Sequence, residues 1–367
     1  MKKSIKVIHT EWSDGWGGQE IRIINEILLL QELGIEIYLA CREHSVIKKK
    51  AQENNINVYS LPFNGNTDIK TLLKLRRIIV LNKINILNSH SSKDTWVGGL
   101  AAKLAGIKFI RTRHLSIPIK KSRLNFINSL ADYIFTTGES VRLEMIKSNR
   151  IDPKIIESIP TGIDSSKFDP KKISREKCRA LFDIDSKDIV IGMVSVLRRF
   201  KRHDQFIKMA RNVIDHNPTK NLKFLIAGEG PQRESIKNLI SELNLNKNVH
   251  LLGHIEQVPE LIKALDIFVL SSDSGEGVSQ SLMQALMMGT AVISTNVGST
   301  SDLYLDDNFM MIDVDSQSQL NRACNNLIFD EKLRQSYQNR SRSHVLKNFS
   351  NERMIEKITR VYDYLIQ

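Results

Sequence analysis

The feature that most constrains the fold is an alternation of short apolar segments with amphipathic segments, which runs twice along the chain. Short apolar runs predict buried strands, and the patterns between them, for example 19–33, 68–81, 95–104 and 138–148, predict helices. The predicted strands are 5–9, 36–40, 57–61, 84–88, 108–111, 133–136 and 155–159 in the first series, and 189–196, 222–227, 249–252, 267–270 and 291–295 in the second. Repeated strand–helix units of this kind form parallel sheets with helices on both faces.

Two such series predict an α/β protein of two Rossmann-like domains facing a central cleft. A chain of 367 residues exceeds one comfortable core. We expect a first domain over 1–168 and a second over 169–348, with the polar, charged segment 166–188 as a linker. A helical pattern at 351–366 predicts a final helix within 349–367. Ligands of such sheets bind at the carboxyl ends of the strands.

The charge of the chain is strongly positive and lies mainly in the first domain. The net charge is +12. The segment 103–123 contains no acid and seven basic residues: Lys103, Lys108, Arg111, Arg113, Lys120, Lys121 and Arg123. Such a face favours an anionic partner, which can be a nucleic acid, a membrane surface or a lipid-linked phosphate, although a merely solvated basic surface is the alternative. Aromatic residues make up only 6%, and no nucleic-acid-binding motif occurs, so we expect no nucleic-acid partner.

The remaining composition favours a cytoplasmic protein. The three cysteines are scattered, with neither a disulfide framework nor a CxxC metal pattern. No apolar run reaches the ~18–20 residues of a membrane span. The first ten residues lack a secretory apolar region and are expected to form the first strand.

The stretch 271–300 combines a glycine-rich loop with the start of a helix. Gly275 and Gly277 flank Glu276 and allow the backbone to turn tightly, and a helix is expected over 278–288. A carboxylate can bind sugar hydroxyls, while the free N–H groups at a helix N-terminus can hold phosphate. The stretch therefore suits a sugar-phosphate ligand.

Other polar groups follow predicted strands. The loop after the first strand contains Gly15, Gly17 and Gly18, flanked by Trp12 and Trp16. His90 and His114 end two successive strands, where we expect Arg111 and Arg113 to keep the His114 imidazole neutral. The run after strand 189–196 gathers Arg198, Arg199, Lys201, Arg202 and His203, which can supply charge-assisted donors to a diphosphate. Each feature alone also fits a glycine turn, a structural histidine or a solvated charge cluster.

Together these motifs resemble those of the retaining glycosyltransferases of the GT-B type, family 4. The resemblance runs from Trp12 to about Val297 and includes the turn GEGP at 228–231 and the segment PTGIDSSKF that leads to the second domain. In that family the first domain faces the acceptor, the second binds a nucleotide-sugar, and the last helix packs back on the first domain.

The resemblance implies a role for each matching residue. Lys201 and, at an offset position, Arg198 would hold the donor diphosphate, Glu276 would orient the sugar, and His114 would lie close to it. Gln284 stands where the family has a second glutamate, and its amide can bind the ribose hydroxyls without charge. The remaining donor-site residues would be Gly17, Gly18, Gly228, Glu229, Gly277, Val278 and Ser279.

The implied activity is transfer of a sugar from a nucleotide-diphosphate sugar to a glycan or lipid-linked acceptor, with retention of configuration. Such an enzyme would serve lipopolysaccharide, O-antigen or other surface polysaccharide synthesis, peripherally on the cytoplasmic face of the inner membrane. No cofactor besides the donor co-substrate and no metal is expected, since the DxD pairs Asp183/Asp185 and Asp313/Asp315 lie outside the donor motif. The alternatives are a nucleotide-sugar epimerase or phosphorylase of the same fold, and a non-catalytic nucleotide-sugar or glycan-binding protein.

Overall fold

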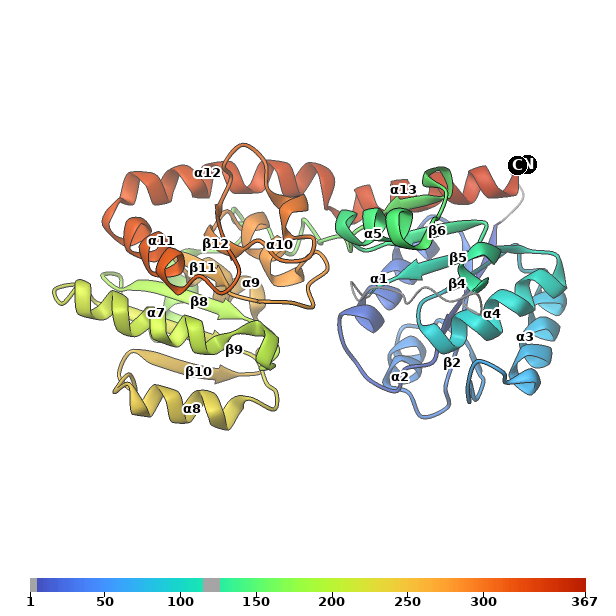
Figure 1. The fold of residues 1–367 in the computed structure, drawn as a ribbon, viewed down its shortest axis with the longest axis horizontal. Coiled ribbons are helices and arrows are strands. Elements are labelled where there is room, and N and C mark those ends of the chain that lie inside the picture. The colour runs from blue at the N-terminus through green and yellow to red at the C-terminus, as the bar shows by residue number, and fades with distance from the viewer. Residues whose placement is uncertain (1–4, 115–125) are drawn as a thin grey trace. The chain divides into compact units, whose positions relative to one another are not determined.

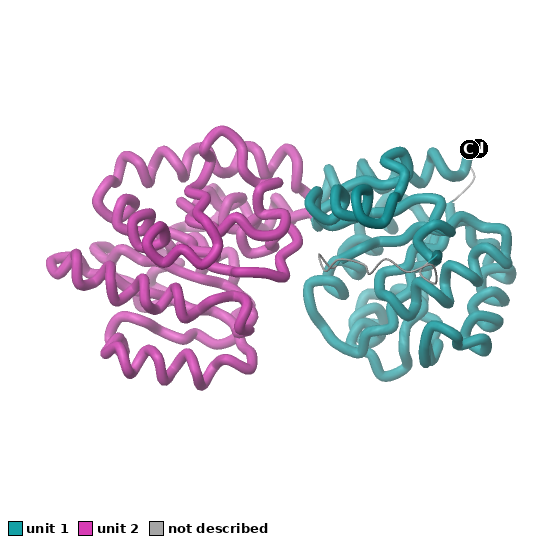
Figure 2. The backbone as a smooth tube through the Cα atoms, viewed as in Figure 1, with its two compact units in different colours: residues 1–161, 351–367 teal, residues 162–350 magenta. Residues whose placement is uncertain are grey.

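The computed structural model describes residues 5–114 and 126–367. The chain forms two compact units, which are coloured separately in Figure 2. Unit 1 consists of Met1–Thr161 together with Asn351–Gln367, and unit 2 consists of Gly162–Ser350. Each unit is a parallel sheet covered by helices, in agreement with the predicted fold class (Figure 1).

Unit 1 contains a seven-stranded parallel sheet in the order β3-β2-β1-β4-β5-β6-β7. The strands are β1 Lys6–Glu11, β2 Glu36–Cys41, β3 Asn57–Ser60, β4 Ile86–Ser89, β5 Lys108–Arg113, β6 Tyr133–Thr136 and β7 Ile156–Ser158. The helices are α1 Gly18–Glu32, α2 Val46–Glu53, α3 Ile69–Asn82, α4 Ser92–Ala105, α5 Glu139–Asn149 and α13 Asn351–Ile366. The strand order reverses between β1 and β4, and a reversal of this kind opens a crevice at the carboxyl ends of the strands.

The last helix, α13, completes the core of unit 1. Its apolar residues Met354, Ile358 and Tyr362 are buried in one cluster with Ile23 and Ile27 of α1. A stripe of buried residues three and four positions apart is typical of a helix that packs on a core. Unit 1 is therefore built from both ends of the chain.

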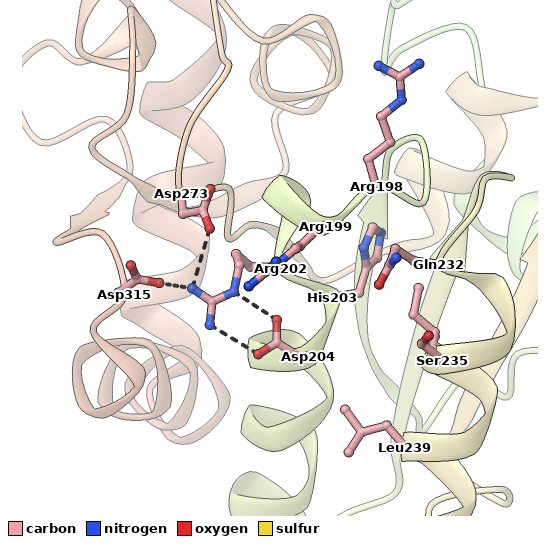
Figure 3. Close-up of a pocket in the computed structure, with 11 residues that line it drawn as sticks. Arg198, Arg199, Arg202, His203, Asp204, Gln232, Ser235, Leu239, Asp273 and Asp315 are labelled. Carbon is pink, nitrogen blue, oxygen red and sulfur yellow. Dashed lines mark hydrogen bonds and ion pairs between the residues drawn. The ribbon is translucent and has the colours of Figure 1, made fainter.

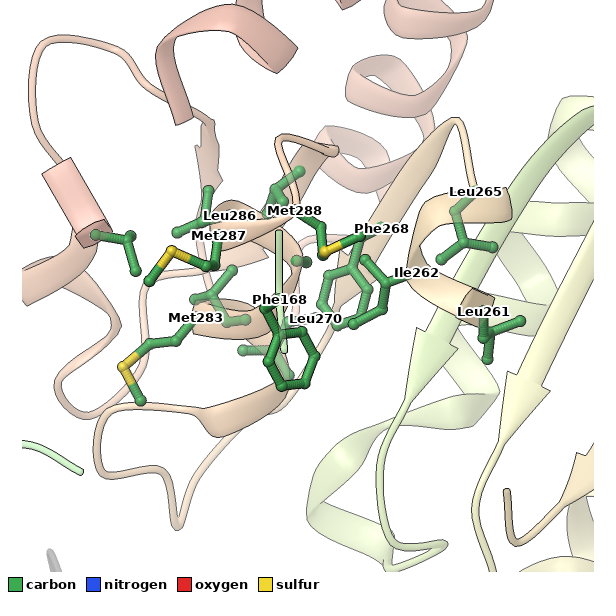
Figure 4. Close-up of a cluster of buried hydrophobic side chains, with 14 of the residues drawn as sticks. Phe168, Leu261, Ile262, Leu265, Phe268, Leu270, Met283, Leu286, Met287 and Met288 are labelled. Atoms are coloured by element: carbon green, nitrogen blue, oxygen red, sulfur yellow. The ribbon is translucent and has the colours of Figure 1, made fainter. Parts of the chain in front are cut away.

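Unit 2 contains a six-stranded parallel sheet in the order β10-β9-β8-β11-β12-β13. The strands are β8 Ile189–Val194, β9 Leu222–Ala227, β10 Val249–Gly253, β11 Ile267–Leu270, β12 Ala291–Thr295 and β13 Met310–Ile312. The helices are α6 Arg175–Leu181, α7 His203–His216, α8 Arg233–Glu242, α9 Val258–Ala264, α10 Gln280–Met287, α11 Gln317–Phe329 and α12 Glu331–Asn348. Figure 4 shows how Phe268 and Leu270 of β11 pack with Met283, Leu286 and Met287 of α10, which fixes the helix that follows the glycine-rich loop.

The structure corrects two expectations about the fold. The segment 166–188 is no free linker, because it forms α6 and the Arg179 guanidinium is buried there, where its Nη2 donates to Asp266 Oδ2 at 2.8 Å. Phe168 is buried in the unit 2 core, and the division between the units falls after Thr161. Strand β13 was not predicted, because its three residues give too short an apolar run to distinguish from a loop.

Candidate functional site

Lys201 and Glu276 form a buried ion pair in unit 2. Lys201 ends the short 3-10 helix η3 (Arg199–Lys201) after β8, and Glu276 lies in the loop after β11. The ammonium of Lys201 contacts Glu276 Oε1, and the Ser272 hydroxyl donates to the same oxygen at 2.6 Å. Lys201 is 9% exposed and Glu276 is 6% exposed. Each of these buried charges is stabilised by the opposite charge next to it. The Lys201 ammonium has three N–H groups, so it can still donate to an anionic ligand.

Glycines hold the loop of Glu276 in place. Gly298, with φ +57, passes so close that a Cβ there would lie 1.9 Å from the Glu276 carbonyl oxygen. Gly275, with φ +70, lies against the ring of Phe200, the neighbour of Lys201. Both positions need a residue without a side chain. The loop of Glu276 is therefore packed against the backbone at Gly298, and it contacts the segment of Lys201 through the Phe200 ring and the hydrogen bond from the Asp273 N–H to the Phe200 carbonyl at 2.9 Å.

The backbone of the GEGP turn packs against the segment that follows β8, at the same end of the sheet. A Cβ on Gly228 would lie 1.9 Å from the Ser195 carbonyl oxygen, and one on Gly230 would lie 2.7 Å from that of Leu197. The Leu197 N–H donates to the Glu229 carbonyl at 2.9 Å. The Glu229 carboxylate accepts from Arg233 Nη1 at 2.8 Å and is half exposed. The structure thus explains the two glycines by close packing, while the role of Glu229 toward a donor stays a prediction.

The basic run after β8 divides into paired and unpaired cations around a pocket of about 500 Å³ (Figure 3). Arg202 forms ion pairs with Asp204, Asp273 and Asp315. Arg198 is exposed, and its side chain points away from these carboxylates. Among the residues that the structure describes, Arg198 has no ion-pair partner. One member of the Asp313/Asp315 pair therefore serves to hold Arg202, and Arg198 remains available for an anion.

Of the predicted donor-binding residues, Gly277, Val278 and Ser279 directly precede α10, and Gln284 lies within it. The helix begins at Gln280, two residues later than predicted, and Ser279 is its N-cap residue with an extended backbone. Val278 and Ser279 are buried, whereas Gly277 and Gln284 are partly exposed. The Ser279 hydroxyl does not cap the helix, which leaves the N-terminal N–H groups suited to an anion.

Three histidines form a hydrogen-bonded row at the strand ends of unit 1. His9 Nδ1 lies 2.8 Å from His90 Nε2, and His90 Nδ1 lies 2.9 Å from His114 Nε2. The rings of His9 and His90 stack with centroids 5.1 Å apart. The structure brings together the predicted His90 and His114 and adds His9, which sequence reasoning missed. Its place near the end of β1, beside β4, was the available signal.

Burial keeps these imidazoles neutral. It lowers the pKa of His9 to about 3, with a further contribution from the charge of Arg22. Burial also lowers the pKa of His114 well below its usual value, assisted by Arg22 and Arg113. We had expected Arg111 and Arg113 to be the cause. Arg113 does contribute, but the second charge that lowers the His114 pKa is that of Arg22 and not that of Arg111. Arg111 is itself buried, which lowers its own pKa to about 10.

The glycine loop of unit 1 leads directly into α1. Gly17 is the N-cap residue, its N–H donates to Glu20 Oε2 at 2.9 Å, and a Cβ on Gly18 would meet no atom within 4 Å. Beside it, the fully buried Glu11 accepts from the Ser13 N–H at 2.7 Å and from the side chains of Gln19 and Ser91. Burial raises the pKa of Glu11. Glu11 also escaped sequence reasoning, since a lone glutamate at a strand end has no distinctive spacing.

Within residues 5–114 and 126–367, no helix combines the length and the apolar content needed to cross a bilayer. In the same residues, no group of three or more histidine, cysteine or acidic side chains is arranged to hold a metal ion. Cys41, Cys178 and Cys324 are all buried with free thiols.

Both units match family models of known proteins. Residues 16–167 match the family model Glycosyltransferase Family 4, and residues 174–344 match the model Glycosyl transferases group 1. A curated relative from Escherichia coli, UDP-Gal:alpha-D-GlcNAc-diphosphoundecaprenol alpha-1,3-galactosyltransferase, is 25% identical over 98% of this chain and 96% of its own.

Solved structures agree with this placement. A glycosyltransferase from Rickettsia africae is 20% identical with a TM-score of 0.89, covering 100% of this chain and 99% of its own. The HepE protein from Anabaena in complex with UDP is 16% identical with a TM-score of 0.86, covering 98% and 100%. With matches across both units and a shared fold, the chain belongs to the GT-B-type glycosyltransferases of family 4, the glycosyl transferases group 1.

Proposed function

We propose that this glycosyltransferase moves a sugar from a nucleotide-diphosphate sugar to a lipid-linked acceptor, with retention of anomeric configuration and without a metal. The observation that carries the proposal is the buried pair of Lys201 and Glu276 at the strand ends of unit 2. An ammonium and a carboxylate side by side suit a ligand that presents a diphosphate next to a sugar. The solved relative that holds UDP supports a nucleotide diphosphate as the leaving group.

The chemical step follows from these charges. The bond between the anomeric carbon and the diphosphate oxygen breaks, and negative charge grows on the departing oxygen. Lys201, together with Arg198, stabilises that charge, which is the role a metal plays in other enzymes. Ser272 and Lys201 already occupy Glu276 Oε1, so a sugar hydroxyl would be met by Oε2.

Retention is proposed through a same-face reaction. A double displacement needs a carboxylate nucleophile against the anomeric carbon. Glu276 is held by Lys201 and Ser272 as a charge-balancing group, which suits orientation of the sugar better than attack. The acceptor hydroxyl would instead approach the face that the diphosphate leaves, and the departing phosphate oxygen would take its proton.

The acceptor is proposed to be a polyprenyl-diphosphate-linked glycan at the cytoplasmic face of the inner membrane, used for lipopolysaccharide or another surface polysaccharide. The name of the E. coli relative states such an acceptor for that protein. The expected basic patch at 103–123 needs correction here, because Arg111 is buried and Lys103 pairs with Asp132. Lys120, Lys121 and Arg123 lie outside the described residues.

Helix α3 offers a better membrane-facing surface. Ile69, Leu73, Val80 and Leu81 on this helix are each more than half exposed. The helix contains no acid, and Lys70, Lys74, Arg76 and Arg77 are exposed on it. A helix that exposes both apolar and basic residues suits the headgroup region of an anionic membrane.

The test is transfer itself. The protein is incubated with a panel of nucleotide-diphosphate sugars and with undecaprenyl-diphosphate-linked acceptors, in the presence of EDTA. We expect release of the nucleoside diphosphate and a product whose anomeric configuration, measured by NMR, equals that of the donor. Epimerised donor would instead identify an epimerase, donor bound without turnover a binding protein, and an inverted product or a strict metal requirement would contradict the proposed mechanism.

A further inference from the structure

The row of histidines in unit 1 has a directional property. Neutral imidazole carries a single N–H, so each ring can donate from one nitrogen and must accept at the other. His9 and His90 share one bond, and His90 and His114 share the next. Because His90 uses both nitrogens, its two bonds must run the same way. The whole row therefore has only two arrangements of protons.

In the first arrangement, His9 Nδ1–H donates to His90, and His90 Nδ1–H donates to His114 Nε2. His114 then carries its own proton on Nδ1. In the second arrangement all the protons lie on Nε2, and His114 donates inward along the row. The two arrangements differ at the far end by whether His9 Nε2 is a lone pair or an N–H. That atom is buried and has no hydrogen-bond partner in the described structure.

Arg22 decides between the arrangements. It is fully buried and donates through Nη1 to the Ile159 carbonyl at 2.6 Å, while its Nε lies 3.5 Å from Glu26. Its Nη2 has no acceptor among the residues described. The charge of Arg22 acts on His9, as it does on His90 and His114. A lone pair at His9 Nε2 is favourable in the field of this cation, whereas an N–H there would be a further buried donor without a partner.

We propose that His9 and His90 are positioning residues that lock His114 as its Nδ1–H tautomer, with the direction of the row set by Arg22. His114 Nε2 is then committed to His90, and Nδ1–H is the donor that His114 offers to a ligand. Given the proposed function, this donor favours a sugar oxygen that accepts a hydrogen bond. The tautomer itself does not depend on that function.

The first experiment is spectroscopic and uses the ligand-free protein. Long-range 1H–15N spectra of protein labelled in histidine distinguish the two tautomers, with His114→Gln and His90→Gln used for assignment. We expect a protonated Nδ1 in His9, His90 and His114. The exposed His44 and His254 serve as internal controls, and their signals should be averaged over the two tautomers. A protonated Nε2 on His114, or an averaged signal, overturns the proposal.

The second experiment removes the far end of the row. His9→Phe retains a ring for stacking but cannot donate, whereas His9→Asn retains an N–H near the position of Nδ1. We expect His114 in His9→Phe to give a signal averaged over the two tautomers, and the donor KM to rise several-fold with kcat nearly unchanged. His9→Asn should largely restore the single tautomer of His114 and the wild-type KM. Unchanged His114 tautomer in a folded His9→Phe protein overturns the proposal. If wild-type protein transfers no sugar, the proposed function fails, while the wild-type spectra still decide the tautomer.

Discussion

The two units treat the polar groups at their strand ends in different ways. In unit 2 two buried charges are matched there, with Lys201 against Glu276. In unit 1 the histidines at the strand ends are neutral and pass hydrogen bonds from ring to ring, while the buried Arg22 pairs with Glu26 and its Nη2 has no described acceptor. Unit 2 is therefore suited to recognising charge, and unit 1 to presenting a donor of fixed direction.

The largest effect is expected when the ammonium of Lys201 in unit 2 is removed, which tests whether unit 2 recognises charge. Lys201→Ala should lower kcat by roughly 100-fold, because one donor to a developing oxyanion is typically worth about 3 kcal/mol. Steady-state kinetics with saturating donor measures the effect. Lys220→Ala, at an exposed basic position of unit 2 outside the pocket lining, is the control and should keep kcat within about threefold of wild type. Near-normal turnover in a folded Lys201→Ala protein would refute the assignment of Lys201 to the leaving group.

The neutrality of the unit 1 histidines predicts a pH dependence of stability. The folded pKa of His9, about 3, lies below its unfolded value of about 6.5. Below pH 6.5 the unfolded state therefore binds more protons at this site than the folded state, and stability is lost as the pH falls toward 3. Between pH 6.5 and 5 the loss from His9 should approach about 1.4 kcal/mol per pH unit.

The chain offers a selective probe for this measurement. All three tryptophans, Trp12, Trp16 and Trp96, lie in unit 1, so denaturant unfolding followed by tryptophan fluorescence reports that unit. Burial raises the pKa of Glu11 and of Asp94, which shifts stability in the opposite direction. The difference between wild type and His9→Phe isolates the histidine. Parallel pH curves for the two proteins would show that His9 is not held neutral.

A smaller effect is expected at the ribose site of unit 2. Gln284→Ala should raise the donor KM about fivefold with kcat nearly unchanged, because loss of a neutral hydrogen bond costs about 1 kcal/mol. Gln284→Glu is the matched variant and should retain donor binding, since it restores the acid of the family. A donor with 2′-deoxyribose should lose affinity for wild type but little more for Gln284→Ala. If the two losses simply add, Gln284 does not contact the ribose.

The smallest effect concerns the membrane-facing surface of unit 1. Binding to vesicles that contain phosphatidylglycerol should exceed binding to neutral vesicles and fall as salt rises. Lys74→Ala on α3 should weaken binding by at most about fivefold, since a basic residue near an anionic surface is worth about 1 kcal/mol. Lys220→Ala, an exposed position of unit 2, is the control. Salt-insensitive binding, or equal effects of the two variants, would remove α3 from the interface.

Most of the fold could be predicted from the sequence, because buried parallel strands are short apolar runs. All twelve predicted strands are present, as in β6 Tyr133–Thr136 and β11 Ile267–Leu270, whose bounds match fully. The segment around α6 was misjudged since its charged composition hides its tertiary partners. Arg179 stabilises it by donating to Asp266 and to the Asp188 carbonyl at 2.9 Å. Contacts between residues so far apart in the chain leave no local pattern.

The site was predictable where a motif fixes the backbone. The glycines around Glu276 and the GEGP turn pointed to loops that the structure shows to be closely packed. The pairing of Lys201 with Glu276 across 75 residues was not foreseen, although both were singled out. His9 and Arg22 were missed altogether, because their importance depends on which strands become neighbours and on burial. Neither property is visible in the spacing of residues along the chain.

The contribution of α13 to unit 1 has a consequence for how the protein is made. During synthesis residues 1–161 leave the ribosome before unit 2, yet α13, the helix that covers Ile23 and Ile27, leaves it only after unit 2. Unit 2 has its whole sequence available earlier, so it can fold while unit 1 waits with an open apolar face. A nascent chain in this state needs protection from aggregation, and a polypeptide that stops before Asn351 would keep that face exposed. Translation must therefore pass through α13 before the first unit is complete.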